Sequence, residues 1–153
     1  MSEQVSVKRH IAASADSLYE LVSDLPRMGE WSNENTGGKW VGKGAAGQVG
    51  SRFKGTNRNG RHGWTTTSTV VAANPAQQFA FDVTTGPVKI SRWAYLFESH
   101  DDGTTTVTET WTDHRPSLLV KPTGMLSGVK DRVAFSRAGM ERTLEALAAT
   151  AES

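Results

Sequence analysis

Residues 53–71, FKGTNRNGRHGWTTTSTVV, contain the local signal that decides the fold. Asn59-Gly60 lies between two strand-forming segments, a pattern that predicts a β-hairpin with a two-residue type I′ turn. Such a turn sets residue 58 opposite 61, and therefore 55 opposite 64 and 53 opposite 66. The residues that would then share one face of the hairpin are Phe53, Gly55, Asn57, His62, Trp64 and Thr66.

Three later segments alternate between two faces, as half-buried strands do. The first places Phe79, Phe81 and Val83 on one side, and residues 90–98 do the same with Trp93, Tyr95 and Phe97. In residues 104–114, threonines at every second position alternate with Val107, Glu109, Trp111 and Asp113. Because threonine forms strands and tolerates solvent, the threonine face is expected outside and Glu109 inside.

The two ends of the chain add a strand and helices. Residues 4–12 alternate as a first strand, and Ser14 then caps a short helix. Pro26 fits the start of a second short helix that leads to Trp31. The segment 116–128, rich in Pro and Gly, is expected to be a connector that acts as a lid.

From about residue 127 the spacing predicts one C-terminal helix of about six turns. Its buried stripe would consist of Val129, Val133, Ser136, Met140, Leu144, Leu147 and Ala151. This order of elements predicts an α+β fold in one domain, residues 1–153, in which a curved antiparallel sheet wraps around the long helix. Such a cup keeps a cavity, because one helix does not fill the whole curvature.

Composition excludes several classes of protein. The 153 residues carry a net charge of +1, so no nucleic-acid or anionic membrane partner is expected. The chain has no cysteine, which excludes disulfides and a thiolate nucleophile. No stretch has the length of a membrane span or the pattern of a signal peptide, and a cytoplasmic protein is expected.

The chain resembles the START/SRPBCC superfamily, the helix-grip fold, and within it the polyketide cyclase/dehydrase-like branch. The resemblance is carried by VSVKRHIAASADSLYELVSDLPRMGEW, GSRFKGTNRNGRHGW, RWAYLF, VTETW and the C-terminal helix. It implies seven strands in the order 1-7-6-5-4-3-2, two short helices after the first strand, and a ligand cavity between sheet and C-terminal helix. It implies no metal in this branch, and we expect no cofactor.

Glu109 is the candidate catalytic residue. An even register around Asp101 would pair it with Trp93, and burial among indoles would raise its pKa into the range of a general acid or base. The alternative is a structural role, in which Glu109 pairs with an inward Arg9 or accepts a hydrogen bond from a Trp N–H.

Candidate ligand-binding residues come from three elements. Asn57 and His62 flank the hairpin end, where they would orient a polar ligand group at the cavity mouth or belong to a solvated tip. Ser136 would offer a hydroxyl or bond back to its own helix, and Met140 would be adaptable lining. The aromatic candidates are Trp31, Phe53, Trp64, Phe81, Trp93, Tyr95 and Trp111, which are either core or walls for a flat ligand.

Three functions are compatible with these residues. The first is binding of a hydrophobic or aromatic small molecule, lipid- or polyketide-like. The second is a cyclase or dehydratase in which Glu109 exchanges a proton while Tyr95, His62 or Arg115 polarises a carbonyl. The third is a protein-interaction or stress-type module with contacts at residues 118–120 and Phe135, where a homodimer contact is also an option.

Overall fold

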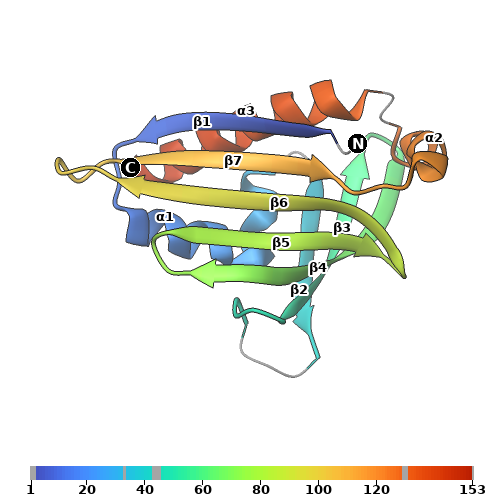
Figure 1. The fold of residues 1–153 in the computed structure, drawn as a ribbon, viewed down its shortest axis with the longest axis horizontal. Coiled ribbons are helices and arrows are strands. Elements are labelled where there is room, and N and C mark those ends of the chain that lie inside the picture. Colours follow the sequence, from blue (N-terminus) through green and yellow to red (C-terminus); the bar gives the residue numbers. More distant parts are fainter. Residues whose placement is uncertain (1–2, 33, 43–45, 129–130, 153) are drawn as a thin grey trace.

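The computed structural model describes residues 3–32, 34–42, 46–128 and 131–152. Its elements in chain order are β1 (Gln4–Ile11), α1 (Ala15–Ser23), the 3₁₀ helix η1 (Leu25–Glu30), β2 (Asn35–Val41), β3 (Arg52–Asn59), β4 (His62–Asn74), β5 (Gln78–Thr85), β6 (Val88–Ser99), β7 (Thr105–Asp113), α2 (Ser117–Ser127) and α3 (Arg132–Glu152) (Figure 1). The strands form one antiparallel sheet in the order β1-β7-β6-β5-β4-β3-β2. The predicted α+β helix-grip fold and its strand order are therefore confirmed.

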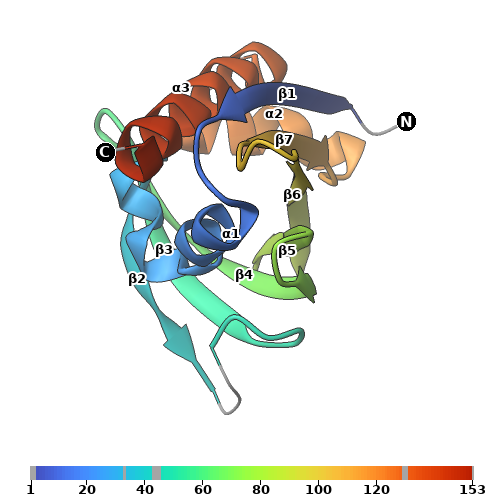
Figure 2. The same cartoon turned by 90° about the vertical axis from the view of Figure 1, so that its left-hand side faces the viewer.

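The sheet curls so that its inner face surrounds α1, while α3 lies along β1 (Figure 2). The side-chain oxygen of Ser14 accepts a hydrogen bond from the Ser17 N–H at 3.2 Å, as expected of a helix cap. Leu18 and Val22 of α1 are buried. The main core joins α1 and the inner strands to Leu144 and Leu147 of α3.

The β3–β4 hairpin forms, but its predicted register is wrong by two residues. Asn59 pairs with His62, so Gly60 and Arg61 are the loop, and Gly55 lies opposite Thr66 instead of Trp64. A type I′ turn needs positive φ at both loop residues, whereas Gly60 has a φ of 62° and Arg61 is not among the described residues with positive φ. A glycine with positive φ at the first loop position matches a type II′ turn. A shift of two residues keeps the predicted face of every side chain.

The β6–β7 hairpin shows the same kind of correction. Ser99 pairs with Thr105, and Glu109 therefore lies opposite Tyr95, not Trp93. The loop is closed by two hydrogen bonds, from the His100 N–H to the Thr104 carbonyl at 2.9 Å and from the Gly103 N–H to the His100 carbonyl at 3.1 Å. This loop is centred on residue 102, one residue beyond the predicted centre, which moves the pairing by two.

The C-terminal segment differs from the prediction of one helix from residue 127. Residues of the expected connector form the separate helix α2, and Val129 lies outside the described residues. Gly128 follows α2 with a φ of 74°, the left-handed conformation that ends many helices. Asp131 then starts α3, because its carboxylate accepts the Ala134 N–H at 3.1 Å.

The hairpin turn makes a direct prediction about stability. Gly60→Ala places an L residue at positive φ, where no heavy atom lies within 4 Å of the added Cβ, so its cost is conformational. We expect the free energy of unfolding to fall by about 1 kcal/mol. Gly63→Ala is the matched control, because its added Cβ would meet only ordinary contact with the Asn57 carbonyl oxygen at 3.6 Å. Urea unfolding of both variants measures the difference, and an equal effect at the two positions would contradict the observed turn.

Candidate functional site

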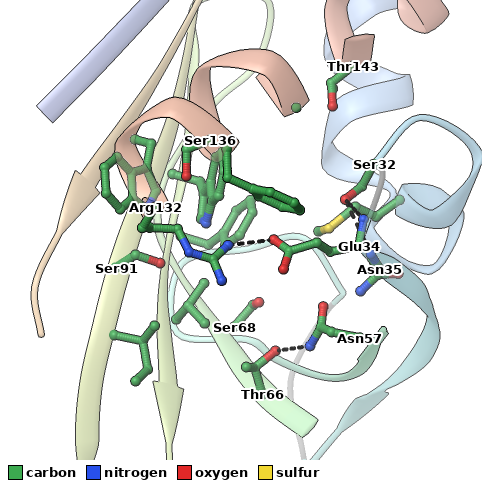
Figure 3. A pocket seen from close by; sticks show the side chains of 18 of the residues that line it. Ser32, Glu34, Asn35, Asn57, Thr66, Ser68, Ser91, Arg132, Ser136 and Thr143 are labelled. Carbon is green, nitrogen blue, oxygen red and sulfur yellow. Dashed lines mark hydrogen bonds and ion pairs between the residues drawn. The ribbon is translucent and has the colours of Figure 1, made fainter. Parts of the chain in front are cut away.

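A cavity of about 270 Å³ lies between the inner face of the sheet and α3. Side chains from η1, all strands from β2 to β7, and both C-terminal helices line it. Figure 3 shows Ser68, Ser91 and Ser136 directed toward this space from β4, β6 and α3. The volume is slightly below the usual range of small-molecule sites, about 300–1,000 Å³.

Aromatic side chains form much of the cavity wall. The strands supply Trp64, Phe81, Trp93, Tyr95 and Trp111, while Trp31 follows η1 and Phe135 projects from α3. Trp93 and Trp111 are direct cross-strand partners, so their indoles stand on neighbouring strands of the same face. Rings in this arrangement offer flat apolar surfaces to a ligand.

Part of the buried face of α3 lines the cavity, and the rest of that face packs against other side chains of the core. Ser136, Gly139 and Thr143 line the cavity at spacings of three and four, which keeps them on one helix face. Met140 is buried against Val5 and Trp111 and is not among the cavity-lining residues. Beyond Arg132 and Phe135, the helix therefore presents small side chains to the cavity.

Glu109 and Tyr95 form a buried hydrogen bond within the cavity wall. The Tyr95 hydroxyl donates to Glu109 Oε2 at 2.8 Å, and the two residues are 7% and 2% exposed. Burial raises the pKa of Glu109 to about 8, against a smaller lowering by the hydrogen bond from Tyr95. Burial also raises the pKa of Tyr95 well above its usual value, and the charge and hydrogen bond of Glu109 add to this. At neutral pH Glu109 is therefore mostly a neutral carboxylic acid.

The structural alternatives expected for Glu109 are not what the structure shows. Arg9 is exposed and lies opposite Val107, so it does not neutralise Glu109. The partner is the hydroxyl of Tyr95 and not a Trp N–H. The observed register explains this, because it puts Tyr95 directly across from Glu109.

Three buried side-chain oxygens form no hydrogen bond with any described residue. They are Glu34 Oε2, Glu109 Oε1 and Ser136 Oγ, and all three belong to residues that line the cavity. The expected alternative for Ser136, a bond to a carbonyl of its own helix, is therefore not observed. Such polar atoms are costly when buried, and functional sites are where proteins retain them.

Ion pairs border the cavity. Arg132 Nη1 of α3 contacts Oε1 of Glu34, the residue before β2, at 2.8 Å. Figure 3 shows this ion pair. The Arg132 guanidinium carbon also lies 5.2 Å from the centre of the Phe135 ring. Arg115, which was expected to polarise a carbonyl, contacts Asp113 at 2.8 Å. Burial opposes the charge of Asp113, yet the hydrogen bonds and charge of Arg115 together hold its pKa below the usual value.

The candidate pair at the hairpin end is separated. Asn57 lines the cavity and donates from Nδ2 to Thr66 Oγ1 at 3.0 Å, as Figure 3 shows. His62 is exposed and is not among the cavity-lining residues. Its ring packs against Gly128, where an added Cβ would lie 2.6 Å from an imidazole carbon. His62 thus contacts the residue that ends α2.

Phe53 also lies away from the cavity. It is 1% exposed and packs edge-on against Trp40, with ring centres 5.6 Å apart. Gly38 allows this contact, because a Cβ there would lie 2.6 Å from the Phe53 ring. Of the candidate residues, the structure therefore brings Trp31, Asn57, Trp64, Phe81, Trp93, Tyr95, Glu109, Trp111 and Ser136 to the cavity. It places Phe53, His62 and Met140 elsewhere.

Among the described side chains of α2, Leu118, Val120 and Met125 are exposed apolar residues. Leu119, the middle residue of the expected contact segment 118–120, lines the cavity instead. Phe135 was expected at a protein contact, but it also lines the cavity beneath Arg132. The residues expected at a protein contact are therefore divided between the protein surface and the cavity wall.

Sequence reasoning missed several polar residues of the site. Glu34 and Arg132 are 98 positions apart, and no local pattern connects them. Thr143 could have been predicted from the helical spacing, because it lies seven residues after Ser136 on the same helix face. Its hydroxyl donates to the Trp31 carbonyl at 3.1 Å, which ties α3 to the end of η1.

Two searches of the described residues were negative. In residues 3–32, 34–42, 46–128 and 131–152, no three His, Cys, Asp or Glu side chains form a group able to hold a metal ion. Within the same ranges, none of the helices has the length and apolar character needed to cross a membrane.

Comparison with known proteins gives one family and many similar structures. The profile of the family described as polyketide cyclase / dehydrase and lipid transport matches residues 2–152. No curated protein matches the sequence. The Polyketide_cyc-like protein Cgl2372 of Corynebacterium glutamicum is 28% identical, with a TM-score of 0.66 over 97% of this chain and 90% of that one.

Two more distant structures share the fold. Ginseng major latex-like protein 151 from Panax ginseng is 13% identical, with a TM-score of 0.74 over 98% of this chain and 97% of that one. The di-domain ARO/CYC StfQ of the steffimycin biosynthetic pathway is 14% identical, with a TM-score of 0.75. The match covers 99% of this chain and 51% of StfQ, so the chain spans about half of that protein.

The raised pKa of Glu109 predicts a pH-dependent stability. Its unfolded pKa is about 4.3, so the folded protein binds the extra proton between that pH and about 8. The free energy of unfolding should therefore fall as pH rises through this window, by up to about 1.4 kcal/mol per pH unit from this group. Glu109→Gln removes the titration, and its stability relative to the wild type should increase from pH 5 to pH 8.

Chemical unfolding of both proteins at several pH values measures this difference, because the titration of other groups is common to the two. Glu98→Gln is the matched control, since Glu98 is exposed on β6 and the same change there leaves the side chain in water. Parallel pH curves for the wild type and Glu109→Gln would show that burial does not perturb this carboxyl.

Proposed function

Because the chain belongs to the polyketide cyclase / dehydrase and lipid transport family, we propose that it binds a small hydrophobic or aromatic molecule between the sheet and α3. The observation that carries the proposal is a cavity of about 270 Å³ with aromatic walls, whose lining residues include three with an unpaired buried oxygen. The ligand is polyketide-like or lipid-like, with an apolar body and few polar groups.

The lining supports an apolar body. Tryptophan and phenylalanine rings each bring large apolar surfaces, and a ligand covering them removes that area from water. The small side chains Ser136 and Gly139 on the opposite helix leave space in front of these rings. Binding therefore requires no rearrangement of the sheet to make room.

Binding is tested with two probes, 2-naphthol for an aromatic body and 1-decanol for an alkyl chain. We expect both Trp fluorescence and titration calorimetry to detect saturable binding of at least one probe. Ser91→Phe fills the cavity from β6 and should weaken binding at least about tenfold, or about 1.4 kcal/mol.

Ser99→Phe is the matched control, because it makes the same change at an exposed position of β6. It should leave the dissociation constant unchanged. Equal effects of the two substitutions, with folding of both verified by thermal unfolding, would mean that the probes bind outside the cavity and would contradict the proposal.

A cyclase-type reaction is the second candidate, favoured by the position of Glu109 and Tyr95. An acid with a pKa of about 8 exchanges protons near neutral pH, and the Tyr95 hydroxyl lies 2.8 Å from it. StfQ, described as an ARO/CYC of a biosynthetic pathway, shares this fold and gives a reason to consider such chemistry here. His62 has no part in this version, whereas Arg115 lines the cavity.

The reaction would be an intramolecular aldol condensation. Ionised Glu109 removes a proton from the carbon beside one carbonyl, and that carbon bonds to the second carbonyl carbon. Protonated Glu109 returns the proton to the resulting alkoxide oxygen. Loss of a second proton from the same carbon together with the hydroxyl group then forms the C=C bond and releases one water. The simple diketone 2,6-heptanedione tests this chemistry, because it closes to 3-methylcyclohex-2-enone with loss of one water. If Glu109 is the base, the rate should rise with pH toward about 8 and fall at least about a hundredfold in Glu109→Gln. A rate equal to that of buffer, or one unaffected by this substitution, would exclude the reaction.

A further inference from the structure

Two residues of the cavity wall carry a buried polar atom that no described residue satisfies. Glu109 Oε1 and Ser136 Oγ are buried, line the same cavity, and make no hydrogen bond with any residue in the described ranges. The two residues are 2% and 3% exposed, so both are almost completely shielded from bulk water. They come from β7 and α3, the two elements between which a ligand would lie.

The Tyr95 hydrogen bond distinguishes the two oxygens of Glu109. Tyr95 donates to Oε2, so Oε2 acts as an acceptor. Burial keeps the carboxyl mostly protonated at neutral pH, and its proton then belongs on Oε1, the oxygen without a partner. Oε1 is consequently a hydrogen-bond donor directed at no protein acceptor. A serine hydroxyl is a second donor in the same region.

The charged groups of the cavity lie in ion pairs. Arg132 is paired with Glu34 and Arg115 with Asp113. On β1, Val7 lies opposite Glu109. Arg9, two residues further along this strand, lies opposite Val107 and is exposed. From β6, Tyr95 is the polar group directly opposite Glu109, and Ser136 of α3 lines the same cavity. The residues directly opposite Glu109 on the two neighbouring strands, Val7 and Tyr95, are thus uncharged.

Resting on the proposed binding function, we infer that Glu109, oriented by Tyr95, and Ser136 form a donor site that recognises a carbonyl oxygen of an uncharged ligand. A carbonyl oxygen has two lone pairs and can accept from both donors. A hydrocarbon of the same shape leaves both donors unpaired, and such mismatches discriminate more strongly than differences in apolar contact. The apolar body of the ligand then lies along Trp93 and Trp111.

Two probes that differ only in this group test the inference, 1-tetralone and tetralin. The measured quantity is the ratio of the tetralin to the tetralone dissociation constant, obtained by Trp fluorescence. Glu109→Leu should lower this ratio about tenfold, the equivalent of about 1.4 kcal/mol and of one hydrogen bond, while tetralin binding changes little. Ser136→Ala should lower it in the same direction by a smaller factor.

Glu109→Gln is the matched variant, because its amide oxygen accepts from Tyr95 and its NH₂ group donates to the ligand. It should keep the ratio within about threefold of the wild type. The infrared carbonyl stretch of bound 1-tetralone gives a second readout. It should lie at lower wavenumber in the wild type and in Glu109→Gln than in Glu109→Leu, because a hydrogen bond weakens the C=O bond.

The outcomes separate the two proposals. If both probes bind and the ratio is the same in the wild type and in folded Glu109→Leu, the donor site is wrong while cavity binding stands. If Glu109→Gln loses the preference as fully as Glu109→Leu, donation by residue 109 is also wrong. If neither probe binds the wild type at millimolar concentration, the binding function itself fails.

Discussion

The inner face of the curved sheet is broader than the helices that pack against it, and the cavity follows from this mismatch. α3 packs mainly along β1 and touches β7, whereas α1 covers parts of β5 and β6. Between these contacts, inward side chains of the central strands face α3 across open space.

The same mismatch explains why polar groups survive inside the protein. A fully packed core would bury Glu109 against apolar atoms without compensation, which is strongly unfavourable. In the cavity wall, one oxygen of Glu109 accepts from Tyr95, and the other has no partner among the described residues. The protein accepts reduced stability at this position, as is common where a site must be ready for its ligand.

The border of the cavity has a different chemistry from its interior. Glu34 and Arg132 join the start of β2 to the start of α3, and their side chains are each only 16% exposed. Thr143 ties the same helix to the backbone after η1. These contacts hold α3 at a set distance from β2 and η1, so the width of the cavity depends on polar contacts as well as on apolar packing.

Much of this arrangement followed from the sequence, because side chains alternate along a strand with a period of two. The threonine pattern of β7 placed Glu109 and Trp111 inside, and both are buried. The predicted registers of two hairpins were each wrong by two residues, yet a shift of two leaves every side chain on its face. The helix stripe was predicted with similar success from Val133 onward, although Gly128 and Asp131 divide the segment into two helices.

By itself, therefore, the sequence determined the fold class, the strand order through the family pattern, and which face each strand residue occupies. Only the tertiary structure decided which inward residues meet. Tyr95 became the partner of Glu109 through the geometry of a five-residue loop, and Arg132 met Glu34 across 98 positions. Packing of α3 against the sheet placed Ser136 in the cavity wall and Met140 in the core with Val5 and Trp111. Local spacing encodes the face of a side chain, but distances between faces arise only when the whole sheet closes on the helix.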